Sequence, residues 1–293
     1  MKRCLVPMYI SLAAILAGVT LTSAGGASGT DAGDSLTALE KRAGGRLGVA
    51  AVDTASGKRL EYRSGERFAM CSTFKLLLVG AVLLRVDAKK DVLDRRVPYG
   101  ASDLLDYAPI TKAHVQEGGM TLSALCGAAI QYSDNTAANL LLDLMGGPSA
   151  LTEYARLLGD TTTRLDRREP HLNSNEAGDV RDTTTPAAML ETMRKLLVED
   201  SLSAASRRQL QEWLNGNTTG GTRLRAGFPA DWRVGDKTGT GPNGATNDLA
   251  IAWPPGRRPV LAAVYFTDST MAAAERDAVV RDAAKIITAE FAQ

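Results

Sequence analysis

The spacing of hydrophobic and polar residues changes twice along the chain, and these changes predict the order of its secondary structure. Residues 47–65, LGVAAVDTASGKRLEYRSG, have the pattern of two strands joined by a Ser-Gly turn. Strand patterns return after residue 215 in WRVGDKTG, ATNDLAIAWP and PVLAAVYF, and the residues from 271 onward carry the apolar stripe of a helix. Between these ends the apolar spacing is that of helices, predicted at residues 72–85, 121–132, 136–145, 148–158, 185–197 and 203–214.

This order of elements predicts an α/β fold of the α+β type. Short connections between the last three strands indicate antiparallel pairing. We expect a five-stranded antiparallel sheet flanked by helices, built from residues 28–66 and 217–293. An all-helical domain, residues 67–216, is then inserted between the two halves of the sheet and includes a long irregular loop, residues 164–182. A cleft between the two parts is the expected place for a ligand.

Residues 1–27 have the pattern of a signal peptide. Two basic residues precede an apolar run, and small residues offer cleavage after Ala24 or Ala27. The alternative is a membrane anchor, which Pro7 and Gly18 argue against because they interrupt a run of marginal length. No second apolar run of membrane length follows. We therefore expect an exported protein, periplasmic or secreted, with no membrane segment after cleavage.

Composition narrows the range of functions. The 34 Lys and Arg residues nearly balance the 33 Asp and Glu residues, so no bulk charge draws the chain to nucleic acid or to an anionic membrane. The two histidines, His114 and His171, have no metal-like spacing, which argues against a zinc site and against a Ser-His-Asp triad. We expect no cofactor and no metal. Signal cleavage would leave Cys71 and Cys126, for which we expect buried thiols although export permits a disulfide.

The segment FAMCSTFKLLLVGAVLL places a lysine at the start of an otherwise apolar helix. Ser72 and Lys75 are three residues apart, so their side chains share one helix face and can touch. The alternative explanation is that Ser72 merely caps the helix and that Lys75 extends toward solvent. However, burial and the positive end of the helix dipole both lower the pKa of a lysine placed there. Such a lysine can accept the proton of a neighbouring hydroxyl and so activate a serine without histidine.

Two further motifs follow in the chain. YSDN, residues 132–135, lies between two predicted helices, and DKTGTG, residues 236–241, ends a predicted strand. Alone, the first could be a helix cap and the second a solvated edge strand. S-x-x-K, S-D-N and K-T-G in this order form the motif set of class A β-lactamases and penicillin-binding proteins.

From about Asp34 to its C-terminus, the chain therefore resembles a class A serine β-lactamase. The resemblance is strongest in STFK, SDNTAANLLL, RLDRREPHLN, RDTTTP and DKTGTG. It implies an enzyme that hydrolyses the amide bond of β-lactam antibiotics through a serine acyl-enzyme, that gives antibiotic resistance, and that is usually monomeric. The substrate would be a small β-lactam, with a catalytic water.

The resemblance also implies a role for each motif residue. Ser72 is the nucleophile, with Lys75 and Ser133 as the proton network around it. Asn135 would contact the amide side chain of the substrate. Three residues of the K-T-G strand would receive the substrate carboxylate, and they are Lys237, Thr238 and Thr240. The backbone N–H groups of Ser72 and Thr240 would form the oxyanion hole.

The long loop decides between related activities. The resemblance assigns Glu169 and Asn173 to holding and activating the water that releases the acyl group. It identifies residues 164–182 as an omega loop pinned by ion pairs from Arg164 to Asp166 and from Arg167 to Asp182, with a cis bond after Glu169. Penicillin-binding proteins lack this glutamate loop. Whether Lys75 or Glu169 is the base for acylation stays open.

Some positions depart from the family pattern. The segment GATNDLAI lacks an arginine that some members carry after K-T-G, and Arg223 matches the position that other members use for the same carboxylate. Tyr107 matches an aromatic residue at the cleft entrance, although a simple surface tyrosine is the alternative. In carbapenem-hydrolysing relatives, a cysteine at the position of Cys71 forms a disulfide with a cysteine just after K-T-G-T. That second position is Gly241 here, which argues against carbapenem activity.

In other relatives, a cysteine at the position of Cys126 pairs with a cysteine on the helix that carries the nucleophile. That partner position is Val79 here, so this disulfide cannot form either. The segment GTGPNG fits G-x-G-x-x-G, but a strand follows it rather than a helix, so we do not assign nucleotide binding.

Two other functions remain as alternatives to the hydrolase. A cell-wall D,D-peptidase should lack Glu169 and Asn173, and a β-lactam sensor should carry linked membrane segments.

Overall fold

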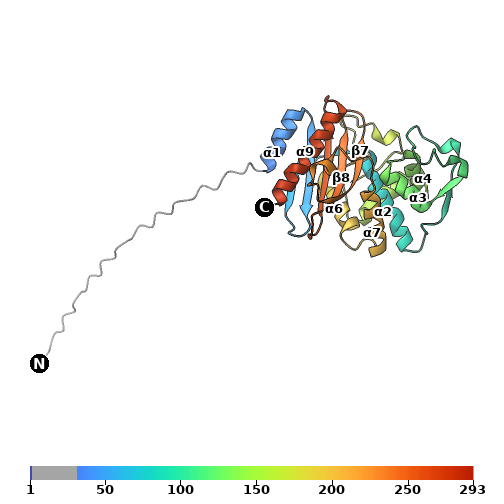
Figure 1. Cartoon of the computed structure of the whole chain (residues 1–293), viewed down its shortest axis with the longest axis horizontal. Coiled ribbons are helices and arrows are strands. Elements are labelled where there is room, and N and C mark those ends of the chain that lie inside the picture. Colours follow the sequence, from blue (N-terminus) through green and yellow to red (C-terminus); the bar gives the residue numbers. More distant parts are fainter. Residues whose placement is uncertain (2–31, 293) are drawn as a thin grey trace. The chain divides into compact units, whose positions relative to one another are not determined.

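The computed structural model describes Met1 and residues 32–292 (Figure 1). Apart from Met1, the predicted signal peptide lies outside the described residues. Within the described part of the chain, no helix is both long enough and apolar enough to cross a membrane. Residues 32–292 all fall within one compact unit.

A five-stranded antiparallel sheet is built from both ends of this unit, as predicted. Its strands are paired in the order β2-β1-β9-β8-β7. They comprise β1 (Arg46–Asp53), β2 (Arg59–Tyr62), β7 (Arg233–Thr240), β8 (Thr246–Trp253) and β9 (Val260–Thr267). Strand β7, which carries the K-T-G motif, is therefore an edge strand, and one of its edges is not used by the sheet.

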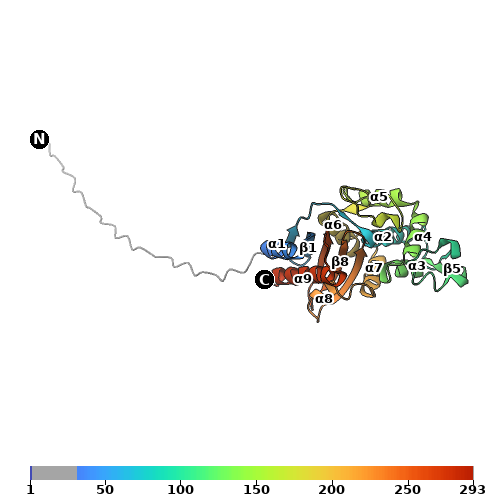
Figure 2. The ribbon, with the colours of Figure 1, turned by 90° about the horizontal axis from the view of Figure 1, so that it is seen from above.

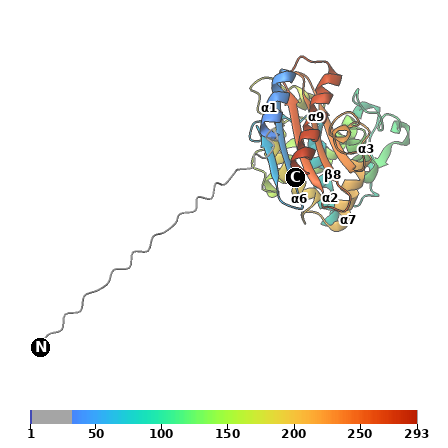
Figure 3. The ribbon, with the colours of Figure 1, turned by 60° about the vertical axis from the view of Figure 1, so that its left-hand side comes forward.

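Both faces of the sheet are covered at its centre, so the inner strands β1 and β9 are apolar almost throughout. One face packs against the helices α1 (Ala32–Ala43), α8 (Leu224–Gly227) and α9 (Ala273–Phe291). Helices α1 and α9 lie side by side on this face (Figure 3). On β9, alternate residues serve the two cores: Ala262 and Val264 face these helices, whereas Ala263 and Tyr265 join the core of the helical part.

The middle of the chain supplies the helical part, which lies on the other side of the sheet (Figures 1 and 2). Its helices begin and end within two residues of their predicted positions. They are α2 (Phe74–Asp87), α3 (Leu122–Gln131), α4 (Asn135–Met145), α5 (Pro148–Leu157), α6 (Pro186–Leu197) and α7 (Ala204–Asn215). Helix α2 is buried on nearly every side, as its apolar sequence predicts.

The prediction that residues 67–216 are all helical is wrong in detail. Two short antiparallel pairs lie within this stretch, β3 (Phe68–Ala69) with β6 (Thr183–Thr184) and β4 (Arg96–Pro98) with β5 (Gly119–Thr121). Two- and three-residue strands are too short for a period to be visible in the sequence. Short 3-10 helices also occur, at η1 (Cys71–Thr73), η2 (Ala101–Asp103), η3 (Val115–Glu117) and η4 (His171–Asn173).

The β3–β6 pair matters for the active site because it closes the long loop immediately beside η1. The main-chain N–H of Met70 also donates to the carbonyl of Asp182, 2.9 Å away. The division of the chain into a sheet domain and a helical domain stays a prediction. The two parts share one apolar core, because Leu261 and Tyr265 of the sheet belong to the same cluster of buried residues as helix α2.

Helices α8 and α9 approach each other so closely that Gly227 has no room for a side chain. A Cβ atom at Gly227 would lie 2.1 Å from the main-chain oxygen of Arg281, whereas one at Gly65 would meet nothing within 4 Å. We expect Gly227→Ala to lower the free energy of unfolding by about 1–3 kcal/mol, the usual cost of overpacking. Urea denaturation checks this, with Gly65→Ala as the matched control. Equal stability of the two variants would contradict the predicted clash.

Candidate active site

The start of the apolar helix differs from the prediction by half a turn. Ser72 lies in the 3-10 turn η1, and α2 begins two residues later at Phe74. No side-chain hydrogen bond caps either element at its start. The Ser72 hydroxyl instead accepts a hydrogen bond from Lys75 Nζ, 2.9 Å away. The structure therefore favours contact between the two side chains over a capping role for Ser72.

Lys75 is the centre of a buried polar cluster. Its side chain is fully buried, and Nζ lies 3.0 Å from Glu169 Oε1, which is also fully buried. Nζ donates to Asn135 Oδ1 at 2.6 Å and to the main-chain oxygen of Ser133 at 2.8 Å. Glu169 Oε1 in turn lies 3.4 Å from Ser72 Oγ. One ammonium thus joins the predicted nucleophile, the S-D-N segment and the predicted base.

Burial shifts the pKa values of both lysines in this cluster. Removal from water lowers the pKa of Lys75, although the nearby Glu169 carboxylate opposes the shift. The pKa of Lys237 is held well below its usual range by burial and by the charge of Lys75. Lysines whose pKa values are lowered give up and take up protons more readily, which suits both groups to exchanging protons with adjacent hydroxyl groups.

The S-D-N segment is held in an unusual backbone conformation. Ser133 has a φ of 56°, in the left-handed region, and Asp134 caps helix α4 by accepting from the N–H of Ala137. This turn directs Ser133 Oγ between the two lysines, with Lys75 Nζ at 3.3 Å and Lys237 Nζ at 3.1 Å. The local cost of a left-handed serine is thus met by a buried network around its hydroxyl.

Glycines bring the K-T-G strand against η1. A Cβ atom at Gly239 would lie 2.8 Å from the main-chain oxygen of Met70, and one at Gly241 would lie 2.7 Å from Cys71 Sγ. The edge of β7 can therefore approach Ser72 only because these positions have no side chain. On the same strand, Thr238 Oγ1 shares a hydrogen bond of 2.5 Å with Thr219 Oγ1.

Arg223 reaches this strand from the segment before α8. Its guanidinium donates to Thr240 Oγ1 at 2.7 Å, and to the main-chain oxygens of Gly239 and Asn247 at 2.9 Å each. Asp277 holds it from α9, with Oδ1 2.7 Å from Arg223 Nε. Most of its donors are already used, so Arg223 acts on the cleft largely through the strand and the Thr240 hydroxyl.

The long loop has the two ion pairs that the sequence predicts. Arg164 pairs with Asp166 at 2.5 Å, and Arg167 pairs with the fully buried Asp182 at 2.5 Å. The bond between Glu169 and Pro170 is cis, also as predicted. These contacts hold the loop under the cleft and fix the main chain on both sides of Glu169.

The side chain of Asn173 completes the surroundings of Glu169. Asn173 Nδ2 donates to Glu169 Oε2 at 2.6 Å. Within the described residues, Asn173 Oδ1 is buried and has no hydrogen-bond partner. A buried acceptor without a partner is costly unless a small polar molecule satisfies it. The carboxylate and this amide oxygen therefore offer a site that suits a water molecule.

These residues surround a cleft of about 350 Å³. Predicted site residues line it from both parts of the chain: Ser72, Tyr107, Ser133, Asn135, Asn173, Arg223, Thr238 and Thr240. Lys75, Glu169 and Lys237 lie buried beneath its floor. Tyr107 is 52% exposed at the rim, so its side chain could serve the cleft or simply face solvent. The roles assigned to all of these residues stay predictions.

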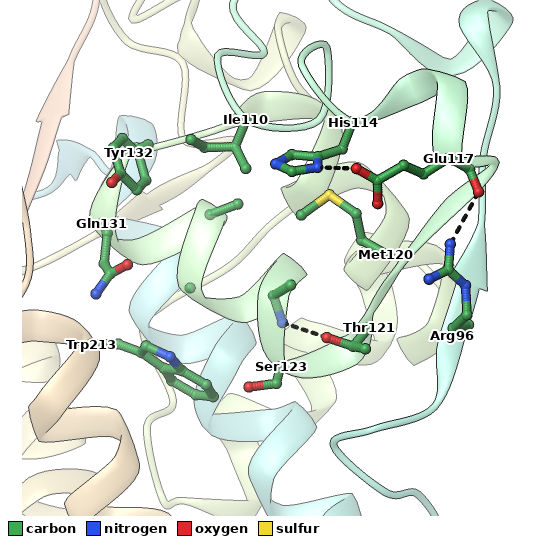
Figure 4. Close-up of a pocket in the computed structure, with 13 residues that line it drawn as sticks. Arg96, Ile110, His114, Glu117, Met120, Thr121, Ser123, Gln131, Tyr132 and Trp213 are labelled. Carbon is green, nitrogen blue, oxygen red and sulfur yellow. Dashed lines mark hydrogen bonds and ion pairs between the residues drawn. The ribbon is translucent and has the colours of Figure 1, made fainter.

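A larger cavity of about 520 Å³ lies between α3 and the segment 96–121 (Figure 4). Its polar groups largely satisfy one another: His114 Nδ1 contacts Glu117 Oε1 at 2.6 Å, and Arg96 donates to the main-chain oxygen of Glu117 at 3.0 Å. Trp213 and Met120 supply apolar walls. It contains none of the clustered serine, lysine and glutamate side chains, so we assign the chemistry to the smaller cleft.

The two cysteines of the described chain are buried free thiols, as predicted. Burial raises the pKa of Cys71 to about 12 and raises that of Cys126 as well. Both thiols are therefore uncharged and unreactive near neutral pH. Cys71 lies close to both Gly239 and Gly241 of the K-T-G strand.

Sequence reasoning missed residues that position others. Asn139 holds the main chain of Glu169, with Nδ2 3.0 Å from its oxygen and Oδ1 3.1 Å from its nitrogen. Asn247 Nδ2 donates to the main-chain oxygens of Ala69 and Met70 just before the nucleophile. Asn139 could have been found, because it lies four residues after Asn135 on one helix and so shares its face. Asn247 gave no local signal.

Comparison with known proteins gives a consistent result. Residues 32–291 match the profile described as the Beta-lactamase enzyme family. Beta-lactamase OXY-2 of Klebsiella oxytoca is 50% identical over 280 residues, which is 94% of this chain and 96% of that protein. Beta-lactamase CTX-M-8 of Citrobacter amalonaticus is 51% identical over 262 residues, which is 89% of this chain and 90% of that protein. The solved structure of an ancestral (GNCA) class A β-lactamase superposes with a TM-score of 0.87 at 59% identity, covering 89% of this chain and 100% of that one.

Two buried carboxyl groups, Asp236 on β7 and Asp248 on β8, have raised pKa values. Asp236 accepts from Arg225 Nη2 at 2.5 Å and from the Asn217 amide. Asp248 accepts from the N–H of Leu224, but within the described residues its Oδ1 has no partner. Burial and the neighbouring Asp236 hold the pKa of Asp248 well above its usual range.

This raised pKa predicts the sign of a pH effect on stability. Between the ordinary pKa of 3.8 and the raised value, the folded state binds more protons at Asp248 than the unfolded state does, so stability falls as pH rises. The Asp248→Asn variant has no such proton to lose. We expect its free energy of unfolding to increase relative to the parent from pH 4 upward, by about 1.4 kcal/mol for each pKa unit of the shift. Denaturant titrations at several pH values check this, and a difference independent of pH would contradict it.

Proposed function

The chain belongs to the Beta-lactamase enzyme family as a class A member, and from the geometry of its cleft we propose that it hydrolyses the amide bond of β-lactam antibiotics through an acyl-enzyme on Ser72. The consequence for a cell that carries it is antibiotic resistance. The observation that carries the proposal is the buried cluster in which Lys75 Nζ lies 2.9 Å from Ser72 Oγ and 3.0 Å from Glu169 Oε1. The Ser72 hydroxyl therefore lies within 3.4 Å of two groups that can take its proton.

In the acylation step, Ser72 Oγ adds to the lactam carbonyl carbon, and the ring C–N bond then breaks. The Ser72 proton passes to Lys75 or, through a water, to Glu169; both groups are in position and the choice stays open. The ring nitrogen receives its proton from Ser133 Oγ, which lies within reach of Lys75 and Lys237. The N–H groups of Ser72 and Thr240 stabilise the oxyanion.

The cleft orients the substrate by its two polar ends. Thr238 and Thr240 line one wall and bind the substrate carboxylate, with the buried Lys237 beneath them and the positive charge of Arg223 assisting. Asn135, whose Oδ1 already bonds to Lys75, directs its amide toward the substrate's acylamino group. Tyr107 packs at the rim. Holding both ends places the lactam carbonyl near Ser72, which is how fixed orientation accelerates the reaction.

Deacylation depends on the long loop. Glu169 and Asn173 hold a water at the unpartnered amide oxygen, and Glu169 removes its proton as the water attacks the ester carbonyl. Ser72 then regains its proton and the penicilloate-type product leaves. The loop ion pairs support this step because they keep Glu169 beneath Ser72.

Other features complete the proposal. The residues in the cleft carry out each step without a cofactor or metal. The enzyme is exported after removal of residues 1–27, works in the periplasm or outside the cell, and acts as a monomer.

The central prediction concerns the Glu169→Ala variant. Incubated with a penicillin, the parent should turn over with little bound acyl group, whereas the variant should accumulate a covalent adduct on Ser72 because deacylation lacks its base. Mass spectrometry of the intact protein and of its peptides measures both. Ser72→Ala is the matched control and should form no adduct.

The same experiment separates the alternatives. A long-lived adduct on the parent itself would contradict the hydrolase and leave a D,D-peptidase or a sensor. The absence of an adduct on parent and variant, without turnover, would show that Ser72 is not the nucleophile.

A second prediction concerns Arg223. We expect Arg223→Ala to raise KM for a penicillin about ten- to a hundredfold. The change removes a positive charge and the support of the Thr240 hydroxyl, which bonds the carboxylate, and a hydrogen bond to a charged group contributes about 1.5–3 kcal/mol. The methyl ester of the same penicillin, which has no carboxylate, should show a much smaller change in KM. Steady-state kinetics with both compounds measures the difference, and equal changes for acid and ester would contradict the role in carboxylate binding.

A further inference from the structure

The far end of the long loop is joined to the sheet by a reciprocal pair of asparagines. Asn175, two residues after Asn173, donates from Nδ2 to the main-chain oxygen of Pro242 at 3.0 Å and to Thr267 Oγ1 at 2.9 Å. Asn243, in the turn between β7 and β8, donates from its Nδ2 back to the main-chain oxygen of Asn175 at 2.6 Å. We call these two side chains and their three hydrogen bonds the asparagine latch.

The backbone at both residues is shaped for this contact. Asn175 has a φ of 48° and Asn243 a φ of 53°, both in the left-handed region that asparagine tolerates better than most residues. The turn at Asn243 is itself fixed, because its main-chain oxygen accepts from the N–H of Asp268 at 2.7 Å. The latch therefore ties the loop to a rigid part of the sheet.

No other hydrogen bonds within the described residues connect residues 164–182 to the sheet part. The remaining contacts of the loop go to the helical part: Asp182 to Met70, Glu169 to Lys75 and Asn139. The latch thus joins the two walls of the cleft at one end. Gly241 lies at this junction, where an added Cβ atom would be 3.1 Å from the main-chain oxygen of Asn173.

A short path leads from the latch to the proposed deacylation site. Only Ser174 stands between Asn175 and Asn173. Asn173 Nδ2 fixes Glu169 Oε2, and its Oδ1 is the unpartnered acceptor. The main chain at Asn173 is otherwise held within its own loop, by donation from its N–H to the oxygen of Pro170 at 3.2 Å. Movement of the loop end would thus displace Asn173 before it disturbed Lys75 or Ser72.

We propose that Asn175 and Asn243 are positioning residues that hold Asn173 against the edge of the sheet, so that the acyl-enzyme is hydrolysed quickly. This proposal rests on the proposed function, since it concerns the deacylation step of that reaction. The latch does not touch the reacting atoms. Its loss slows the attack of water on the ester more than it slows the formation of the ester, because Lys75 keeps its contacts with Ser72, Ser133 and Asn135, which lie outside the loop.

The test uses the variants Asn175→Gly and Asn243→Gly in the mature, full enzyme. Glycine keeps the left-handed backbone without strain and removes only the side-chain hydrogen bonds. Asn243→Asp, which keeps the shape but replaces the donating amide with an oxygen, isolates the bond to Asn175. Lys89→Gly is the matched control, because Lys89 has a φ of 56° and is exposed at the end of α2, away from the cleft.

Rapid-quench mass spectrometry with a penicillin gives the acylation rate, the deacylation rate and the steady-state acyl fraction on Ser72. We expect the deacylation rate of the latch variants to fall about ten- to a hundredfold. The upper limit is the rate that a misplacement of about 1 Å can cost. The acylation rate should fall much less. The acyl fraction should rise accordingly. Lys89→Gly should match the parent.

Unchanged deacylation in folded latch variants would overturn the proposal, as would the same slowing in Lys89→Gly. Thermal unfolding of each variant shows whether it is folded at the assay temperature. If one glycine variant unfolds, Asn243→Asp still decides the question. The parent enzyme separates the two proposals. If the parent does not hydrolyse the penicillin, the proposed function is wrong. If the parent hydrolyses it no faster than the latch variants do, only the proposed role of the latch is wrong.

Discussion

The active site depends on one buried ammonium group. Lys75 is fully enclosed, yet its Nζ contacts the nucleophile hydroxyl, the S-D-N segment and the glutamate of the long loop. An isolated charge in such a place would be very costly, so the surrounding polar groups have to be supplied from several segments. The fold can be understood as the arrangement that brings Ser133, Asn135 and Glu169 to this one side chain. The same burial that makes the group costly also lowers its pKa and suits it to accept a proton.

The rest of the fold holds the residues of this cluster in their positions relative to one another. The edge strand β7 approaches Ser72 because Gly239 and Gly241 leave room for Met70 and Cys71. Asn247 anchors the main chain ahead of the nucleophile, and Asn139 anchors that of Glu169. The helical part and the sheet part each contribute one wall of the cleft, so catalysis depends on contacts that hold the walls together. Side-chain amides make many of these contacts, because they can bond to main-chain groups without adding charge.

Much of this could be predicted from the sequence, where the signal is local. Hydrophobic period alone located the sheet strands and the long helices, because each is long enough to repeat its pattern. The Ser72–Lys75 contact followed from a spacing of three residues on one helix face, although Ser72 proved to lie in a 3-10 turn. The β3–β6 pair was missed because two residues cannot show a period. Asp277, Asn247 and the pairing of Asn175 with Asn243 were missed for another reason: they are created by tertiary packing between distant segments, and a single asparagine or aspartate carries no sign of its partner.

The most direct test of this account is the protonation of Lys75 itself. In protein labelled with 15N-lysine, the Nζ signal of Lys75 can be followed by NMR across the alkaline range and assigned by its loss in the Lys75→Arg variant. The account predicts that this group titrates below the ordinary lysine pKa of about 10.4, because burial disfavours its charge. A titration at or above that value would show that the surrounding carboxylate outweighs burial, and Lys75 could then no longer be regarded as a proton acceptor for Ser72.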